Sequence, residues 1–210
     1  MAVRLPLLYP IVDAGALRRR GWAVEDFARE LKAGGVTLLQ YRDKSGTPQE
    51  VLQAAAAISA VFAGVDCRLI LNDRADLAVL AGFDGVHVGQ GDLLPDEARR
   101  VVGTERWVGT STHTEEQVRA ADLSGADYVA VGPVFATRTK LDAETVIGLE
   151  GVRRARALTR KPVVAIGGIT RANARSVVEA GADSVAVISA LLVEGESVAK
   201  VARDFLEILG

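Results

Sequence analysis

Acidic side chains follow two short apolar segments and have the chemistry to bind a divalent cation. Asp73 ends the run Leu-Ile-Leu-Asn-Asp, and Asp92 comes shortly after Val-His-Val. An aspartate after a strand is often only the N-cap of the next helix, which is the simpler interpretation of either residue alone. Together, with the amides of Asn72 and Gln90 beside them, the two carboxylates favour Mg²⁺. This ion binds one or two carboxylates and completes its shell with water and phosphate oxygens.

Basic residues follow other strands of the same pattern: Arg42, Lys44, Arg138 and Lys140. A surface lysine or arginine is normally only solvated, but these four stand near hydroxyl groups on loops that we expect to face the acidic pair. A metal ion between carboxylates, opposite ammonium and guanidinium groups, suits a bound diphosphate. We therefore expect Arg42, Lys44, Arg138 and Lys140 to contact the oxygens of a metal-bound diphosphate.

A second anion site is predicted near the end of the chain. Gly167-Gly168 follows one apolar segment, and Ile188-Ser189 follows the next. Loops after the last two strands of an eight-stranded barrel frequently bind phosphate through backbone N–H groups. Two adjacent glycines are a weak signal alone, but with Ile188-Ser189 beside them they predict a phosphate loop.

Other reactive side chains are scarce. The chain has two histidines and one cysteine, which leaves no ligand set for a zinc site and no internal disulfide. His87 alternates with valines, so it points either into the barrel or toward the helices, and a hydrogen-bonded core role is favoured over catalysis. Cys67 begins an apolar strand, where a small buried thiol is expected. No protein nucleophile is indicated.

Composition limits the class of protein. The chain has 210 residues, 49% of them hydrophobic, and a formal charge of −2. This content supports a sizeable core and argues against disorder, while the charge does not suggest a nucleic-acid or membrane surface. No stretch fits a signal peptide or membrane span, and the lone cysteine fits a reducing compartment. We expect a soluble, cytoplasmic protein.

The elements that must position these residues repeat as short apolar strand, polar loop and helix. We expect strands at residues 7–12, 36–41, 67–71, 85–88, 107–109, 128–131, 162–166 and 184–188. Helices are expected at 24–33, 48–62, 74–81, 95–102, 149–158 and 171–180, after a capping box at Thr114, and up to about Leu206. A Gly-x-Asp motif ending in Asp84, Asp127 and Asp183 marks three turns that lead into strands.

Eight short apolar strands that alternate with eight helices predict a single α/β domain, a (β/α)8 TIM barrel spanning residues 1–210. A doubly wound open sheet is the structural alternative. It is disfavoured because no Gly-x-Gly-x-x-Gly opens the first helix and because eight strands suit closure. In such a barrel, the residues after each strand share one functional face.

Several of these segments together resemble the thiamine-phosphate synthase family. In chain order they are Gln40-Tyr41-Arg42-Asp43-Lys44, Asn72-Asp73-Arg74-Ala75-Asp76, Gly85-Val86-His87-Val88-Gly89-Gln90 with Asp92-Leu93, Ser111-Thr112-His113, Gly132-Pro133-Val134-Phe135 with Thr137-Arg138-Thr139-Lys140, and Ala165-Ile166-Gly167-Gly168-Ile169. The likeness covers almost the whole chain, and the motifs are specific when taken jointly. Tyr41 departs from the family pattern, where an aliphatic residue is usual.

The resemblance implies a transferase of thiamine biosynthesis. Such an enzyme joins 4-amino-2-methyl-5-(diphosphooxymethyl)pyrimidine to 4-methyl-5-(2-phosphooxyethyl)thiazole and releases thiamine phosphate and diphosphate. A dissociative, Mg²⁺-assisted displacement is expected, in which the thiazole nitrogen attacks the pyrimidine methylene as the diphosphate leaves. The negative charge of the leaving diphosphate would be stabilised by the catalytic residues Arg42, Lys44 and Lys140. The resemblance also implies a homo-oligomer.

Residue roles also follow from the resemblance. It implies that the pyrimidine diphosphate is held by Gln40, Tyr41, Arg42, Asp43, Lys44 and Asn72, with Ser111 and Lys140 on the diphosphate. It implies that Mg²⁺ is bound by Asp73 and Asp92. The thiazole phosphate would be held by Thr137, Arg138, Thr139, Gly168, Ile188 and Ser189.

Two alternative functions remain. A thiazole tautomerase of the same barrel family would bind the thiazole phosphate without forming a carbon–nitrogen bond. It would not need the pyrimidine half of the site, so the intact segment from Gln40 to Lys44 argues against it. A non-catalytic protein that binds phosphorylated metabolites is the other alternative.

Overall fold

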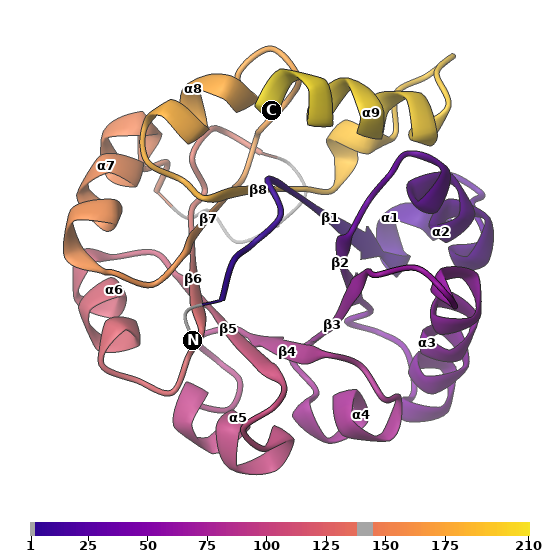
Figure 1. Cartoon of the computed structure of the whole chain (residues 1–210), viewed down its shortest axis with the longest axis horizontal. Coiled ribbons are helices and arrows are strands. Elements are labelled where there is room, and N and C mark those ends of the chain that lie inside the picture. The colour runs from indigo at the N-terminus through magenta and orange to yellow at the C-terminus, as the bar shows by residue number, and fades with distance from the viewer. Residues whose placement is uncertain (1–2, 138–144) are drawn as a thin grey trace.

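Eight parallel strands close into a barrel in the computed structural model, which describes residues 3–137 and 145–210 (Figure 1). Each strand pairs with its neighbour in sequence, and Leu8 opposite Val185 joins the first strand to the last. The strands are β1 (Leu8–Asp13), β2 (Leu38–Arg42), β3 (Arg68–Asn72), β4 (Gly85–Val88), β5 (Trp107–Thr112), β6 (Tyr128–Val131), β7 (Val163–Ile166) and β8 (Ser184–Val187). The predicted (β/α)8 barrel is confirmed.

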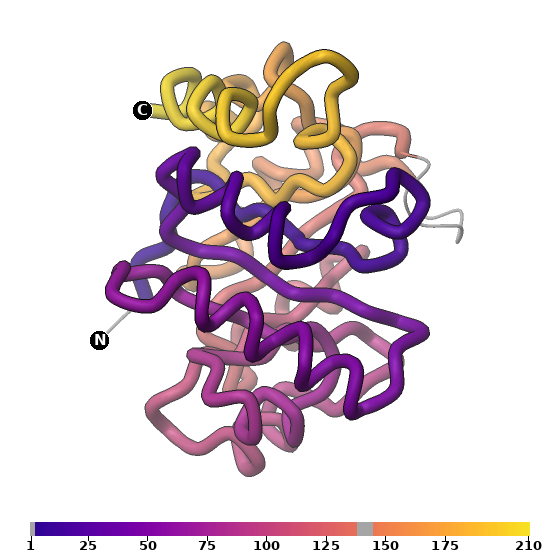
Figure 2. Tube along the Cα trace, turned by 90° about the vertical axis from the view of Figure 1, so that its right-hand side faces the viewer, coloured from indigo at the N-terminus to yellow at the C-terminus, as the bar shows by residue number. Residues whose placement is uncertain are grey.

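Helices surround the barrel, and α2 lies between α3 and α9 on one flank (Figure 2). They are α1 (Ala14–Arg19), α2 (Val24–Ala33), α3 (Pro48–Phe62), α4 (Ala75–Leu80), α5 (Pro95–Val102), α6 (Glu115–Asp122), α7 (Gly148–Leu158), α8 (Ala174–Glu179) and α9 (Val198–Leu209). The predicted capping box is present, because Thr114 Oγ1 accepts a hydrogen bond from the Gln117 N–H at 3.3 Å. None of the helices in residues 3–137 and 145–210 has the length and apolar character to cross a membrane.

Three differences from the sequence prediction bear on the site, whereas other elements differ by one to three residues at their ends and Cys67, expected to be buried, is partly exposed just before β3. A short helix, α1, follows β1 directly, with Asp13 as its N-cap, and a 3₁₀ turn, η1 (Ser189–Leu191), follows β8. Strand β5 extends to Thr112 instead of ending at Gly109, because Ser111 and Thr112 pair with Ala130 and Val131. Ser111 therefore lies on a rigid strand and not in the loop after it.

Two separate apolar layers hold the fold. The outer layer packs strand residues such as Val86 and Val129 against the helices, from which Phe27 and Phe205 project. The inner layer fills the barrel itself with alternate strand residues. Its members are Leu5, Tyr9, Ile11, Leu38, Ile70, Tyr128, Ala130, Val164 and Ala186. The alternation follows from the period of two along a strand.

The aspartates of the repeated Gly-x-Asp motif join neighbouring strands at the amino ends of β4, β6 and β8. The N–H of each aspartate donates to a carbonyl of the preceding strand, and its carboxylate accepts from the N–H of that same residue. The pairs are Asp84 with Leu69, Asp127 with Val108 and Asp183 with Val163, at 2.6–2.8 Å. Arginines pair with the three carboxylates: Arg68, Arg99 and Arg156. The repeat therefore aligns three strand pairs.

Replacing Asp127 with alanine is expected to lower the free energy of unfolding by about 2 kcal/mol, because the buried Val108 N–H and the Arg99 guanidinium lose their acceptor. Urea denaturation followed by circular dichroism measures the change. Asp26→Ala is the control, since its exposed helical pair with Arg29 should contribute less than about 0.5 kcal/mol. Equal losses in the two variants would contradict the aligning role.

Candidate active site

A cavity of about 690 Å³ opens at the carboxyl ends of the strands. Eight of the residues predicted to bind substrate line it: Gln40, Arg42, Asn72, Ser111, Thr137, Gly168, Ile188 and Ser189. They come from β2, β3, β5 and the loops after β6, β7 and β8, so closure of the barrel brings together residues that are far apart in sequence. The volume suits small organic substrates.

The two predicted metal ligands, Asp73 and Asp92, approach each other beside this cavity. Burial raises the pKa of Asp73, and an ion pair with the Lys44 ammonium only partly offsets it, while the neighbouring Asp92 raises it further. Burial also acts to raise the pKa of Asp92, but hydrogen bonds with Asp73 and with the Gly89 N–H at 2.9 Å outweigh it. Two carboxylates so close together repel each other unless a proton or a cation lies between them.

The Asp73 backbone adopts an uncommon conformation. Its φ of 63° makes it the one non-glycine residue with positive φ in the described part of the chain. Its N–H donates to the His87 carbonyl at 2.7 Å, which links the end of β3 to β4. Strained backbone of this kind persists where the surrounding structure holds it, and it is concentrated at functional sites.

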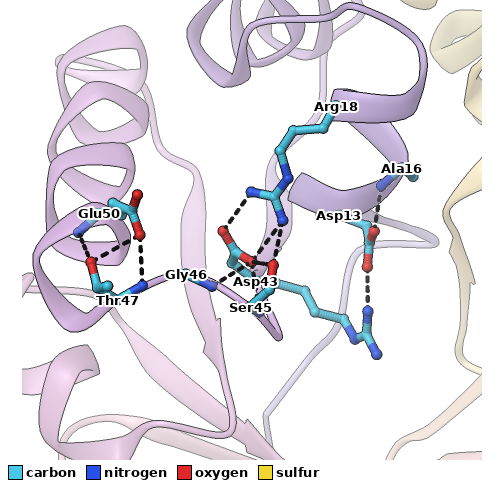
Figure 3. Close-up of polar contacts among 9 residues, drawn as sticks. Asp13, Ala16, Arg18, Asp43, Ser45, Gly46, Thr47 and Glu50 are labelled. Atoms are coloured by element: carbon cyan, nitrogen blue, oxygen red, sulfur yellow. Dashed lines mark hydrogen bonds and ion pairs between the residues drawn. The ribbon is translucent and has the colours of Figure 1, made fainter.

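The loop after β2 is held by an ion pair from α1 (Figure 3). Arg18 donates to both Asp43 carboxylate oxygens at 3.0 and 3.1 Å and to Ser45 Oγ at 2.7 Å. Asp43 also accepts from the N–H groups of Ser45 and Gly46, each at 3.0 Å. The Arg18 guanidinium, followed by the two N–H groups, lowers the pKa of Asp43 to about 2. The Asp43 carboxylate is therefore engaged within the loop, where it shapes the segment that carries Lys44.

Arg42 lines the cavity and is also held by an ion pair with a neighbouring aspartate. Its guanidinium pairs with Asp13, a carboxylate only 5% exposed, whose other oxygen accepts from the Ala16 N–H at 2.7 Å (Figure 3). One aspartate thus caps α1 and orients an arginine on the next strand. Because Asp13 is oriented by the helix it caps, the Arg42 side chain has little rotational freedom.

Other predicted site residues lie elsewhere. Tyr41 is 2% exposed and packs in the outer apolar layer, because it alternates with inward-facing Gln40 on β2. Neither Tyr41 nor Asp43 lines the cavity. The half-exposed Lys44 does not line it either, but its ammonium group forms an ion pair with Asp73. The predicted residues Arg138, Thr139 and Lys140 fall outside the described residues, so their assigned roles remain predictions.

In the predicted phosphate loop, the backbone at Gly168 packs closely against the backbone at Ala136. Gly168 has a φ of 65°, and a Cβ atom there would lie 2.6 Å from the Ala136 carbonyl oxygen, so only glycine fits. Its own carbonyl accepts from Asn173 Nδ2 at 3.1 Å. Ser189 begins the 3₁₀ turn after β8 and lines the same end of the cavity.

Residues that the sequence did not indicate also line the cavity. Arg20 follows α1 and donates to the Leu192 carbonyl at 2.8 Å, which places its guanidinium near the loop after β8. Among the described residues, no carboxylate pairs with it. Tyr9 of β1 also lines the cavity, and its hydroxyl lies 2.9 Å from that of Tyr128, a β6 residue of the inner layer. Hydrogen bonds from these two hydroxyls inside the barrel were not predicted, because both tyrosines stand in apolar strands.

The fold is that of a (β/α)8 barrel protein with a cavity at the carboxyl ends of its strands, the face at which barrels of this class bind their ligands. The chain belongs to the thiamine monophosphate synthase family, whose sequence model matches residues 8–191.

Similar proteins cover nearly the full chain. The thiamine-phosphate synthase of Koribacter versatilis is 53% identical over 209 residues, which are 99% of this chain and 97% of that protein. The thiamine-phosphate synthase of Methanoregula boonei is 44% identical over 95% of this chain and 91% of its own. The solved thiamine phosphate pyrophosphorylase of Pyrococcus furiosus has a TM-score of 0.86 at 32% identity and covers 97% of this chain and 95% of its own.

Proposed function

We propose that this protein is a thiamine-phosphate synthase that joins a pyrimidinylmethyl diphosphate to a thiazole phosphate. The observation that carries the proposal is one cavity lined by two polar groups of residues. Arg42 and Asn72, with the acidic pair beside them, come from β2 and β3, and the Gly168 and Ser189 loops follow β7 and β8. Two anionic substrates that react with each other need such an arrangement, and the family membership supports it.

The acidic pair fits a magnesium ion. Asp73 and Asp92 provide carboxylate oxygens. The pKa of Asp73 is raised by burial and by the neighbouring Asp92, and a bound cation would reduce the repulsion between the two carboxylates. In the described residues no larger cluster of histidine, cysteine and acidic side chains competes as a metal site. When bound, Mg²⁺ would neutralise the charge of the leaving diphosphate.

The residues of the chain supply orientation and charge. Arg42, aimed by Asp13, and Lys44, held beside Asp73, face the diphosphate together with Ser111, and Lys140 is proposed to complete this set. The carbon–oxygen bond to the diphosphate breaks with its electron pair remaining on the diphosphate. The electron-rich aminopyrimidine carries the positive charge until the thiazole nitrogen donates its lone pair to the methylene carbon. No protein nucleophile takes part in this displacement.

A diphosphate-release assay tests the function. The purified protein, with both substrates and Mg²⁺, should release diphosphate and form thiamine phosphate in equal amounts, and omitting either substrate or adding EDTA should stop the reaction. Binding of thiamine phosphate without diphosphate release would indicate a binding protein. Conversion of a thiazole phosphate isomer without the pyrimidine would indicate a tautomerase.

Arg20 is proposed to contact the thiazole phosphate. We expect Arg20→Gln to raise KM for the thiazole phosphate about tenfold with little change in kcat, because the substitution removes a cavity-lining cation that pairs with no carboxylate in the described part of the chain. Steady-state kinetics with each substrate varied in turn measures this effect. Arg19→Gln is the matched control, since the adjacent exposed Arg19 does not line the cavity. A rise confined to KM for the pyrimidine diphosphate would contradict the assignment.

We also propose that the protein forms a homo-oligomer and that it is located in the cytoplasm. The family resemblance supports the first, and the single cysteine supports a reducing compartment. Light scattering coupled to size-exclusion chromatography tests the oligomeric state, and fractionation of the source cells tests the location.

A further inference from the structure

A chain of five hydrogen-bonded side chains crosses the floor of the cavity. Gln40 Nε2 donates to Tyr9 Oη at 3.1 Å, and Tyr9 Oη lies 2.9 Å from Tyr128 Oη. Tyr128 Oη lies 3.1 Å from His87 Nδ1, and His87 Nε2 lies 2.9 Å from Ser111 Oγ. The five residues come from β2, β1, β6, β4 and β5, so only the closed barrel assembles them.

Burial isolates the middle of this chain from water. Gln40, Tyr9, Tyr128 and His87 are each no more than 6% exposed. Burial raises the pKa of both tyrosines far above the ordinary value, so each phenol keeps its single proton. Buried polar groups of this kind need hydrogen-bond partners, and each phenol has two neighbours here.

Gly109 makes the contact between His87 and Tyr128 possible. On β5 it stands opposite His87 of β4 on one side and opposite Tyr128 of β6 on the other. Because Gly109 has no side chain, the two rings meet above it with centroids 5.6 Å apart and an interplanar angle of 30°. A Cβ atom at this position would lie 2.0 Å from Tyr128 Cζ. The network is therefore built into the strand register.

The Gln40 amide, which can only donate through Nε2, sets the direction of each hydrogen bond from Gln40 to Ser111. An amide nitrogen has no acceptor capacity, so Tyr9 Oη accepts from Gln40 Nε2. The buried Tyr9 proton also needs an acceptor, and Tyr128 Oη is the other neighbour of Tyr9 Oη, so Tyr9 donates to Tyr128. Tyr128 then gives its proton to His87 Nδ1, which leaves the histidine proton on Nε2. His87 Nε2–H donates to Ser111 Oγ, and the serine proton is directed into the cavity that Ser111 lines.

We propose that Gln40, Tyr9, Tyr128 and His87 are positioning residues that make Ser111 a hydrogen-bond donor to an anionic oxygen of the bound diphosphate. The identity of that acceptor rests on the proposed function, while the proton order itself does not. A donor whose direction is set before the substrate binds costs no reorganisation as charge develops on the leaving group. Tyr128 is the essential link, because its hydroxyl is the donor to Nδ1.

The first test reads the protonation of His87 in the protein without substrates. With ¹⁵N-labelled histidine, two-dimensional NMR of the ring nitrogens should show His87 with its proton on Nε2 and none on Nδ1. A His113→Asn variant assigns the signals, since the chain has two histidines. Tyr128→Phe should produce a mixture of both tautomers, and Tyr9→Phe a smaller change, because Tyr128 can still donate. A proton on Nδ1 of His87 in the unsubstituted protein would overturn the proposal.

The second test asks whether Tyr128 acts through Ser111. Tyr128→Phe should lower kcat about tenfold with KM nearly unchanged, while the same substitution in a Ser111→Ala background should cause no further loss. Tyr9→Phe is the control, because it also removes a hydroxyl from a buried tyrosine, and it should lower kcat less than Tyr128→Phe does. Losses that multiply in the double variant would show that Tyr128 acts independently of Ser111 and would overturn the proposal.

The two tests separate this proposal from the proposed function. Absence of diphosphate release by the unsubstituted protein would reject the synthase assignment and leave the tautomer measurement valid. An active synthase with the opposite His87 tautomer would reject only the proton-ordered chain. Because the unsubstituted protein decides the tautomer, the proposal stays testable even if a tyrosine variant does not fold.

Discussion

Replacing Asp73 with asparagine should lower the rate of diphosphate release about 1000-fold at saturating substrates while the barrel stays folded. The substitution removes one charge from the acidic pair and keeps the shape of the side chain. Asparagine is preferable to alanine here because the backbone φ of 63° suits Asn and Asp better than other residues. The loss is expected in kcat, since the carboxylate is proposed to bind a cation that would stabilise the leaving group.

Asp76→Asn is the matched control for this variant. Asp76 lies in the same segment, but its carboxylate pairs with Arg74 at the exposed start of α4. Stopped-flow or coupled measurement of diphosphate in single-turnover experiments reports the chemical step, and circular dichroism reports the fold. A single-turnover rate within a few fold of the unsubstituted protein would reject Asp73 as part of the metal site.

Replacing Gly109 with alanine should lower the free energy of unfolding by about 3 kcal/mol. The added methyl group would lie 2.0–2.4 Å from three atoms of the Tyr128 side chain, and that side chain is fully buried. Hydrogen bonds to Tyr9 and His87 hold the tyrosine in place, so β5 and β6 must move apart or the ring must leave its contact with His87. We expect activity to fall as well, because Ser111 lies on the same strand.

Gly91→Ala is the control for the glycine substitution. Gly91 stands next to Asp92, but a Cβ atom there would meet nothing within 4 Å, so its stability should change by less than about 0.5 kcal/mol. Urea denaturation of both variants at the same protein concentration measures the difference. Comparable stability of the two proteins would contradict the packing argument for Gly109.

Much of the fold could be predicted from local patterns. The helices α2, α3 and α5 and the strands β4 and β6 have the predicted bounds, because their apolar periodicity and their Pro or Gly ends are unambiguous. Helix α1 was not predicted, since it is short and depends on Asp13 as its cap. Strand β5 was predicted too short because its polar residues are satisfied by pairing with β6, which composition does not reveal.

The candidate site was predictable to a similar degree. Residues at the ends of several strands, such as Asn72 and Ser111, do line one cavity, which follows from the shared functional face of a barrel. The family resemblance implied a substrate role for Asp43, which stays a prediction, while the structure shows its carboxylate bound to Arg18 and to the loop backbone. Adjacent residues on a strand or turn point in different directions, so proximity in sequence alone does not place a side chain in a site.

The sequence by itself determined the barrel, the family and the group of polar residues at the strand ends, because each depends on periodicity or on motifs within short segments. Only the tertiary structure decided which side chains meet. The approach of Asp73 to Asp92 and the chain from Gln40 to Ser111 depend on the register of neighbouring strands. Register is a property of the closed barrel, and a one-residue shift would turn these side chains to the opposite face.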